Sequence, residues 1–476
     1  MMKRDRRIYL LSQKDYSPET IAVTFAKTSR SPKPFDEIAR ELTNERASEF
    51  HEKWVVGYGH ASVAEHAVLH LALENVSRLA IETIEGNRLA SYTEKSTRYQ
   101  QWDEEAFFIP EEIESNGLKA PFVETCQCLF TTYHSSIPRV EAYFKRAINK
   151  GKDESEKAIE RRVRTAAVDV CRFLLPAAAL ANVGVTINAR ALEYAICKML
   201  SAPLVEVQQI GDQLRRVAGL ETPTLIKYAA CNPYLLSIRE KAHDFASILE
   251  KPKGSNDFRR VSFNPNGQDE VLAAILFRFS ARADYENTLA FVQKLDKEAK
   301  KNLVVELMNS RGRFDQPVRE FEYAQMTFEV VMDQGAYFEF KRHRMMTQTV
   351  QQLSPDLGFV VPRAIKEAGC EQAYIAAMRK AGDLFKVLAA VSPDAASYII
   401  PNGFNRRALF TMNLREAFNF VRLRTAENAH FSIRRIAQQL VEAIRDIYPL
   451  LGGYLDAPDE DWRDIERDHF SDLRVH

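Results

Sequence analysis

Cysteine, glycine and proline are scarce in this chain. Six cysteines are scattered over 476 residues, only Cys126 and Cys128 lie close together, and no Cys-x-x-Cys pair occurs. This pattern argues against a zinc site or a disulfide framework and favours a reducing compartment, the cytoplasm. The 18 glycines and 19 prolines are too few for a turn-dense all-β domain.

An excess of charge of either sign is absent as well. Lys+Arg and Asp+Glu both number 65, so no overall field would concentrate nucleic acid or an anionic membrane. The basic start is followed by only a short apolar stretch, which argues against a signal peptide. The most apolar segment, residues 166–185, contains Asp169, Arg172 and Pro176. Lipid would penalise those charges, so we expect a buried helix that delivers a charge to a site, and no membrane partner. Because the charges balance, we also expect no nucleic-acid partner.

Helical periodicity dominates what is present. Apolar residues recur at three- and four-residue spacing in segments 63–83, 156–175, 191–214, 374–391 and 414–448. Strand-like runs are short, such as 328–332 and 359–361. The pattern predicts an α+β protein of mostly helical mass. At about 100–200 residues per domain, the length predicts two to four domains.

One motif, which we interpret as helix-borne, occurs twice, at residues 86–99 and 342–354. The first copy keeps Ser96 and Arg98, whose counterparts in the second copy are a glutamine and a serine. The second copy alone keeps an intact triplet, Arg342-His343-Arg344. Each copy has lost what the other keeps, which predicts a duplicated domain whose halves cooperate to build one active site.

Polar clusters at residues 251–256 and 264–267 mark the boundary between the two copies. We place the first half at 1–245, a linker at 246–285 and the second half at 286–476. The predicted fold is therefore two homologous, largely helical domains, each with a small sheet, arranged as a pseudo-dimer.

Two clusters of residues that could bind a ligand can also be interpreted as purely structural. His66 and His70, if helical, would share a face and could bind a metal, but the second half has no counterpart cluster. We favour a polar surface in which the histidines have their hydrogen bonds satisfied by protein groups, and we predict no metal. The Arg342-His343-Arg344 triplet could be a basic surface patch. Because it follows the aromatic run Tyr337-Phe338-Glu339-Phe340, we expect it to emerge from a packed element, where arginine suits phosphate.

The segment from Asn413 to Arg424 carries the strongest local signal. At about 100° per residue, Arg415 and Asn419 fall on one side of a helix and Arg424 on the other. Apolar residues fill much of the remainder, which predicts a buried helix that serves two neighbours. Buried arginines need anionic partners, and either Asp and Glu side chains or an anionic ligand could supply them.

Together these segments resemble the flavin-dependent thymidylate synthases. The family's upstream element, Gly-His-x-Ser-x-x-Glu-His, stands at 59–66, and its Ser and Arg-Tyr stand as Ser96 and Arg98-Tyr99. Its downstream Asn-x-Arg-x3-Asn-x4-Arg stands at 413–424. A further family arginine appears as Arg172, sixteen residues before Asn188. The joint match covers most of both halves and is far more specific than any of its parts.

The resemblance implies a reaction and a set of contacts. The implied reaction methylates dUMP to dTMP, with methylene from methylenetetrahydrofolate, hydride from reduced FAD, and NADPH as the ultimate reductant. The implied FAD contacts are His60, Ser62, Glu65, Arg342, His343, Arg344, Asn413, Arg415 and Asn419. The implied nucleotide contacts are Glu94, Ser96, Thr97, Arg98, Arg172, Glu339 and Arg424, with catalytic roles for Ser96 and Arg424. The family's homotetramer implies a homodimer of this chain with pseudo-222 symmetry.

One departure bears on the substrate. The family usually has Gln three residues before the triplet, where this chain has Glu339. A carboxylate beside a uracil carbonyl or a phosphate is unfavourable unless it is protonated or paired, so a different pyrimidine nucleotide is an alternative substrate. A non-catalytic or regulatory flavin- or nucleotide-binding paralogue is a second alternative. Random decay would not sort the losses by role, and we therefore favour catalysis.

Overall fold

The computed structural model describes residues 7, 9–29, 31–57, 61–114, 117–148, 151, 154–246, 248–249 and 257–475. The chain forms two compact units that do not follow chain order. Unit 1 comprises Met1–Lys95, Phe107–Ser115 and Ala179–Lys251, and unit 2 comprises Ser96–Ala106, Asn116–Ala178 and Pro252–His476. Residues 96–106 and 116–178, which belong to the first half by sequence, therefore fold with the second half.

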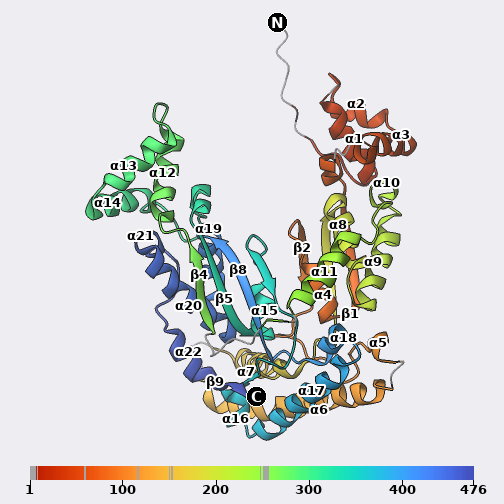
Figure 1. The fold of residues 1–476 in the computed structure, drawn as a ribbon, viewed down its shortest axis with the longest axis vertical. Coiled ribbons are helices and arrows are strands. Elements are labelled where there is room, and N and C mark those ends of the chain that lie inside the picture. The colour runs from red at the N-terminus through yellow and green to blue at the C-terminus, as the bar shows by residue number, and fades with distance from the viewer. Residues whose placement is uncertain are drawn as a thin grey trace. The chain divides into compact units, whose positions relative to one another are not determined.

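Unit 1 contains a three-stranded antiparallel sheet of order β1-β3-β2 (Figure 1). Its strands are β1 (Val68–Ser77), β2 (Ala90–Glu94) and β3 (Leu180–Asn188), and Val185 pairs with both Leu71 and Tyr92. The helices are α1 (Pro18–Thr28), α2 (Phe35–Arg40), α3 (Asn44–Phe50), η1 (His51–Gly57), η2 (Ala61–His66), α4 (Arg78–Glu85), α5 (Glu111–Glu114), α8 (Ala189–Leu200), α9 (Val205–Ala218), α10 (Pro223–Ile226) and α11 (Pro233–Ala246).

Unit 2 contains a four-stranded antiparallel sheet of order β4-β5-β8-β6 and a two-stranded sheet of β7 and β9 (Figure 1). The strands are β4 (Phe258–Phe263), β5 (Gln325–Asp333), β6 (Thr347–Val350), β7 (Phe359–Pro362), β8 (Asn405–Asn413) and β9 (Phe470–Val475). The helices that precede β8 in the sequence are α6 (Lys119–Ala147), α7 (Glu156–Cys171), η3 (Arg172–Leu174), α12 (Gly267–Phe279), α13 (Tyr285–Lys294), α14 (Lys297–Met308), η4 (Arg319–Tyr323), α15 (Gln334–Phe340), α16 (Arg363–Glu367), α17 (Glu371–Ala389), α18 (Pro393–Ala396) and η5 (Ser397–Ile399). After it come α19 (Leu414–Arg424), α20 (Phe431–Ile447), α21 (Pro449–Gly452) and α22 (Trp462–His469).

The two larger sheets share one plan. In each, the central strand β3 or β8 runs into a helix whose N-cap is an asparagine, Asn188 or Asn413, with its side chain accepting a backbone N–H of the first turn. In each, the strand β1 or β5 ends at an N-cap, Ser77 or Asp333, that opens the next helix. The predicted α+β class with a small sheet in each half is therefore confirmed.

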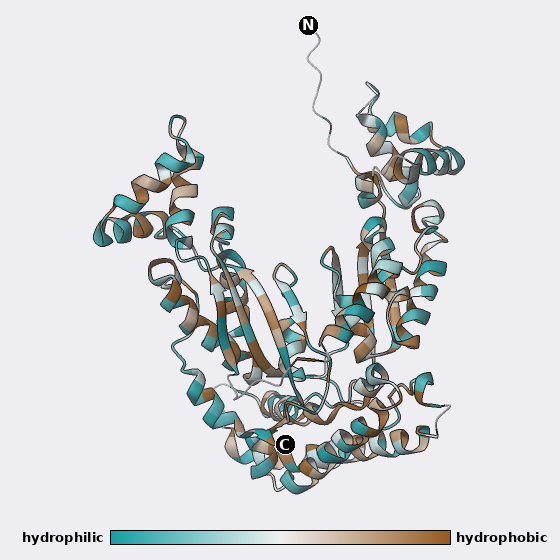
Figure 2. Cartoon of the chain, in the orientation of Figure 1, coloured by the Kyte–Doolittle hydropathy of each residue, from teal (hydrophilic) through white to brown (hydrophobic). Residues whose placement is uncertain are grey.

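The core of unit 2 lies between its four-stranded sheet and the helices α15, α19 and α20. Phe410 of β8 packs against Phe328 of β5, with ring centroids 5.6 Å apart, and against Phe340 of α15 at 4.8 Å. Hydrophobic, brown stretches run along the strands of this sheet in Figure 2. This packing fixes the end of α15, and with it the triplet that follows, against α19.

A short backbone pairing carries first-half residues into unit 2. Ala177 N donates to Ile400 O at 2.9 Å, and Asn402 N donates to Leu175 O at 3.0 Å. The paired segments, around Pro176 and Pro401, are counterparts in the repeated sequence. This pairing places Arg172 in unit 2.

Several helix predictions were wrong in detail. Residues 68–77 form strand β1, because Leu69, Leu71 and Leu73 alternate with more polar residues at a period of two. The repeated motif is not helix-borne: each copy follows a helix and runs into an edge strand, β2 or β6. Segment 191–214 divides into α8 and α9 where Pro203 intervenes, and 414–448 divides into α19 and α20 at residues 425–430, which contain neither glycine nor proline.

Candidate functional site

Arg98 is held in unit 2 by a buried carboxylate. Its Nε and Nη2 both donate to Asp169, at 3.0 and 2.9 Å to Oδ2, and its Nη1 donates to Asn428 O at 2.9 Å. The backbone N of Arg98 donates to the hydroxyl of Ser96 at 3.3 Å. Two of the residues matched to the nucleotide site thus lie together, and the arginine is fixed bidentately at the end of α7.

Arg172 lies beside the same carboxylate, with its side chain 2% exposed. Its Nε is 3.3 Å from Asp169 Oδ1, its Nη1 is 3.4 Å from Thr97 Oγ1, and its Nη2 donates to Gly335 O at 3.3 Å. A Cβ at Gly335 would stand 3.0 Å from both Asp333 Oδ1 and Phe173 Cε1. A glycine at the start of α15 therefore lets Asp333 cap the helix while Phe173, next to Arg172, packs against it.

Glu339 joins arginines from both sequence halves. Its Oε2 accepts from Arg424 Nη1 at 3.0 Å, and its Oε1 is 3.6 Å from Arg98 Nη1. The side chains are 6%, 14% and 17% exposed for Glu339, Arg424 and Arg98. The guanidinium groups of Arg98, Arg172 and Arg424 thus surround two carboxylates, those of Asp169 and Glu339. The carboxylates meet the requirement that buried arginines have anionic partners.

His343, the middle residue of the triplet, is buried against α19. Its Nδ1 is 3.1 Å from Glu416 Oε1, and its Nε2 accepts from Arg424 Nε at 2.8 Å. Its ring packs edge-on against Phe420 at 4.7 Å between centroids. Burial lowers the pKa of His343, although the hydrogen bond with Glu416 opposes the shift.

His430 closes the cluster from the start of α20. Its Nε2 is 3.3 Å from Asp169 O, and its Nδ1 accepts from Ser432 N at 3.2 Å. Burial lowers the pKa of His430 well below its ordinary value, and Arg172 and Arg98 push it the same way. Burial also raises the pKa of the Asp169 carboxyl, against the opposing effect of both arginines. The cluster is thus largely dry, and electrostatic interactions within it are strong.

The remaining second-half residues matched to the flavin site lie on two sides of α19 and after α15. Asn413 caps α19 by accepting from Glu416 N at 2.8 Å. Arg415 donates to Pro317 O at 2.9 Å and lies 3.3 Å from Glu322, whereas Arg424 on the same helix contacts α15 and the triplet. Arg342 is exposed, and Arg344 and Asn419 are half-buried. The prediction that α19 serves two neighbours is confirmed.

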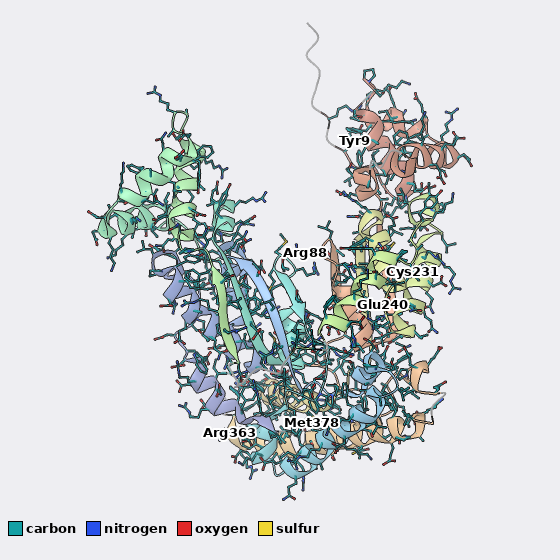
Figure 3. The ribbon with its side chains drawn as sticks, in the orientation of Figure 1. Tyr9, Arg88, Cys231, Glu240, Arg363 and Met378 are labelled. Atoms are coloured by element: carbon teal, nitrogen blue, oxygen red, sulfur yellow. The ribbon has the colours of Figure 1, made fainter. Side chains whose placement is uncertain are left out.

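Glu94, Ser62 and Glu65, three more of the residues matched to the family, belong to unit 1. Glu94, at the end of β2, is buried in an ion pair with Arg78 at 2.9 Å, with both side chains 2% exposed. The first motif copy opens with Gly86-Asn87-Arg88 in place of the Arg-His-Arg triplet. Arg88 is exposed between α4 and β2 (Figure 3). His60 falls outside the described residues. Ser62 and Glu65 are exposed, and Glu65 pairs with Arg190.

Ser62 and Glu65 line a cavity of about 610 Å³ in unit 1. Phe25, Phe50 and His66 contribute aromatic walls, and the remaining lining residues are Ala26, Lys27, Ser29, Ser31 and Val63. A cavity of this size with aromatic walls and a few polar groups suits a planar ring system. His66 ends η2 and His70 lies in β1, so the two do not share a helix face.

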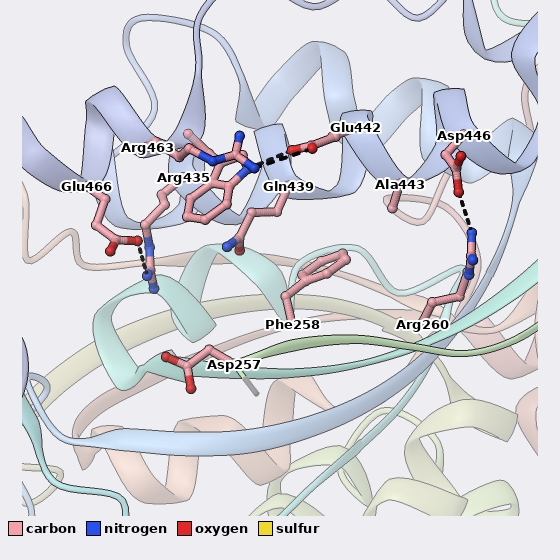
Figure 4. Close-up of a pocket in the computed structure, with 11 residues that line it drawn as sticks. Asp257, Phe258, Arg260, Arg435, Gln439, Glu442, Ala443, Asp446, Arg463 and Glu466 are labelled. Atoms are coloured by element: carbon pink, nitrogen blue, oxygen red, sulfur yellow. Dashed lines mark hydrogen bonds and ion pairs between the residues drawn. The ribbon is translucent and has the colours of Figure 1, made fainter. Parts of the chain in front are cut away.

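A second cavity, of about 720 Å³, lies between β4, α20 and α22 in unit 2 (Figure 4). Its cations are matched by its own acids: Arg260 with Asp446 at 2.7 Å, and Arg435 with Glu466 at 3.4 Å. Arg463 lies 3.5 Å from Glu442 in the same way. Because these rim pairs satisfy one another, this cavity offers no concentrated positive charge to an anion.

Sequence reasoning singled out no role for Glu416 or His430 and noted Asp169 only as a charge in an apolar segment. The signal that the sequence offered for Asp169 was its position three residues before Arg172, which it contacts in the structure. Within the described residues, no helix is long and apolar enough to cross a membrane. Those residues also contain no group of three or more His, Cys, Asp or Glu side chains placed to hold a metal ion.

Fold and cluster together define an α+β protein in which residues from two copies of one motif meet inside a single compact unit. The family model for thymidylate synthase complementing protein matches residues 10–224 and 262–450. The chain belongs to this family, and the resemblance to the flavin-dependent thymidylate synthases is confirmed.

Individual relatives agree with this assignment. The chain is 30% identical over 445 residues to a UPF0159 protein of Chlamydia muridarum, covering 90% of this chain and 84% of that protein. It is 27% identical over 215 residues to a flavin-dependent thymidylate synthase of Clostridium tetani, covering 45% of this chain and 82% of that enzyme. The UMP/dUMP methylase PolB of Streptomyces cacaoi, in a crystal structure with 5-Br dUMP, aligns over 41% of this chain and 92% of its own at 17% identity. The TM-score of that alignment is 0.33.

Proposed function

We propose that the protein is a tandem-duplicated, FAD-dependent thymidylate synthase that methylates dUMP to dTMP. Methylenetetrahydrofolate would donate the one-carbon unit, and NADPH would be the ultimate reductant. The observation that carries the proposal is the meeting of Arg98 and Arg172, from the first copy, with Arg424, from the second. Neither copy alone supplies this set, and the set matches the family's nucleotide-binding residues one by one.

The arrangement suits a nucleotide monophosphate. Arg98 and Arg172 converge on the Asp169 carboxylate, beside the hydroxyls of Thr97 and Ser96, and both hydroxyls can donate hydrogen bonds to phosphate oxygens. Three guanidinium groups face the two carboxylates of Asp169 and Glu339, and Asp333 is a further carboxyl that interacts with Arg172. A phosphate that enters would share the arginines with Asp169 and Glu339.

Arg424 is suited to stabilise charge that develops on the pyrimidine. Its Nε and Nη1 are fixed by His343 and Glu339. Among the described residues no hydrogen bond is made by its Nη2, which leaves that donor for the ring. A fixed donor in a dry site costs little reorganisation as the anion forms, and such donors contribute most of their stabilisation in the transition state.

The residues present fit FAD, which would supply the hydride. The aromatic cavity with Ser62 and Glu65 suits a planar ring, and the exposed Arg342 guanidinium suits a diphosphate. We assign His60, Arg344, Asn413, Arg415 and Asn419 to the same cofactor by the family pattern.

A different pyrimidine nucleotide remains the second candidate substrate, favoured by Glu339 in place of the family glutamine. The pairing of Glu339 with Arg424 and Arg98 weakens that reading, because a paired carboxylate no longer opposes a uracil carbonyl or a phosphate. dUMP is therefore the substrate we propose.

The test measures flavin and product in one preparation. Absorbance spectra with and without added FAD report whether flavin binds. Release of tritium from C5 of labelled dUMP, with methylenetetrahydrofolate and NADPH, reports chemistry at that carbon, and chromatography identifies dTMP. Bound flavin without tritium release or dTMP would mean a non-catalytic paralogue. Product from dCMP and none from dUMP would mean the other pyrimidine.

A further inference from the structure

Three residues of α19 form one stripe along the helix. Glu416, Phe420 and Arg424 are spaced four apart, so they lie on one face, with about 12 Å between the first and last Cα. His343 lies along this stripe: its ring packs on Phe420, its Nδ1 reaches Glu416, and its Nε2 reaches Arg424. The imidazole is thus the physical link between a carboxylate two turns away and the arginine that ends the helix.

The chemistry of these contacts fixes the position of the ring proton. Arginine Nε always carries hydrogen and can only donate, so His343 Nε2, at 2.8 Å, has to accept. The proton of the neutral ring then resides on Nδ1, which donates to Glu416 Oε1 at 3.1 Å. Both ring nitrogens are used, and the side chains of His343 and Glu416 are 3% and 9% exposed. Water therefore does not substitute readily for either partner.

We propose that Glu416 is a positioning residue: it holds His343 as the Nδ1–H tautomer, and His343 in turn fixes the guanidinium of Arg424. The proposal rests on the proposed function for its effect on turnover, though not for the tautomer itself. Without Glu416 the Nε2–H tautomer becomes accessible, and its hydrogen faces the Nε–H of Arg424. That repulsion would turn the guanidinium away and misdirect Nη2.

Charged groups from each packed element face His343. Glu416 and Arg424 come from α19, Glu339 comes from α15, and Arg342 and Arg344 are its chain neighbours. Burial lowers the pKa of His343, the Glu416 carboxylate raises it, and Arg424 lowers it. Removing the charge of Glu416 while keeping a hydrogen-bond acceptor should therefore lower the pKa further and leave the tautomer unchanged.

The first measurement needs neither substrate nor flavin. Ring-nitrogen shifts of ¹⁵N-histidine-labelled protein, assigned by their loss in His343→Gln, should report the Nδ1–H tautomer in wild type and in Glu416→Gln. In Glu416→Leu that signature should be lost. An Nε2–H ring in the wild type, or an unchanged ring in Glu416→Leu, would overturn the proposal. If Glu416→Leu does not fold, the pKa of His343 followed by the same ¹⁵N shifts decides it, because that pKa has to be lower in Glu416→Gln than in the wild type.

The second measurement is the pH profile of turnover. In Glu416→Gln the acid limb should move to lower pH. In Glu416→Leu kcat should fall about ten- to a hundredfold, the range found when a metal-bound imidazole loses the partner that orients it. Glu329→Gln is the matched control, since Glu329 pairs with Arg407 at 2.7 Å in the same unit. An acid limb that does not move in Glu416→Gln would overturn the proposal. A wild type without turnover would refute the proposed function and leave the tautomer measurement standing.

Discussion

Arg98 and Arg424, which are 326 residues apart in sequence (424 − 98 = 326), share the carboxylate of Glu339. The contacts are unequal, 3.6 Å to Arg98 and 3.0 Å to Arg424, so the looser one can yield first to an incoming anion. Because Arg98 comes from the first half of the sequence and Arg424 from the second, this carboxylate links residues of both halves.

Glu339→Gln, which restores the family residue, should strengthen dUMP binding about tenfold. The substitution removes a competing negative charge from two arginines, and one charge-assisted hydrogen bond contributes roughly 1.5–3 kcal/mol. It should also destabilise the ligand-free protein, because two buried cations lose a partner. Calorimetric titration with dUMP and thermal unfolding with and without dUMP measure both effects. Weaker dUMP binding in Glu339→Gln would indicate that the carboxylate itself contacts the nucleotide.

Arg98→Ala and Arg344→Ala should separate the two ligands. Loss of Arg98 should weaken nucleotide binding about ten- to a hundredfold and spare flavin, and loss of Arg344 should do the reverse. Arg98→Ala also leaves Asp169 buried without its bidentate partner, so the double variant Arg98→Ala/Asp169→Asn is the better-folded comparison. Titrations of FAD and dUMP against each variant measure the split.

Arg190→Ala is the control for that comparison. Its ion pair with Glu65 is exposed, and exposed pairs contribute little, so its effect on either ligand should be small. If Arg98→Ala and Arg344→Ala damage both ligands equally, or neither, the division between the half-sites is wrong.

The family resemblance pointed to Ser96, Thr97, Arg98, Arg172 and Arg424, and the structure places all five in unit 2. Their roles stay predictions. The carboxylates that hold the arginines could not be assigned, because sequence does not reveal which acid faces which base. His430 carried no signal at all: its role depends on the packing of α20 against the end of α7.

The fold was predictable by class and less so by element. The alternating leucines of β1 lay inside a longer stretch that also satisfied helical spacing, so the period-two pattern was hidden. Local sequence patterns could not predict that residues 96–106 and 116–178 fold with the second half. That arrangement depends on pairing between the segments around Pro176 and Pro401, which are far apart in sequence.

Unit 2 should lose stability in acid through His469. The ring stacks on Phe431 at 4.7 Å, and burial lowers its pKa from 6.5 to about 4, with Arg434 adding to the shift and Asp468 opposing it. The unfolded ring takes up a proton first, so stability is full above pH 6.5 and falls as the pH drops toward 4. The loss amounts to at most about 3 kcal/mol. Amide exchange of α20 and α22 between pH 7.5 and 5 measures it, and His469→Leu should reduce this pH dependence. The exposed His243→Leu should leave it unchanged.

The protein should be a homodimer with pseudo-222 symmetry. Two chains with two copies each would reproduce the four-copy assembly that the family resemblance implies. Light scattering at micromolar concentration, with flavin bound, measures the mass. A monomer that retains flavin would contradict this prediction.

Arg424→Ala should reduce turnover more than it reduces nucleotide binding. The guanidinium is already held by His343 and Glu339, so its remaining donor gains strength mainly as the pyrimidine becomes anionic. Loss of one such donor typically lowers kcat by about a hundred- to a thousandfold. The Kd of dUMP should change by about tenfold or less, because Arg98 and Arg172 still hold the phosphate. Arg424→Lys keeps a charge but loses the bond to His343 Nε2, so it should recover little of kcat. Single-turnover measurements with saturating dUMP separate chemistry from binding. A loss of dUMP affinity with kcat intact would make Arg424 a binding residue and would leave the stabilisation of the anion to another group.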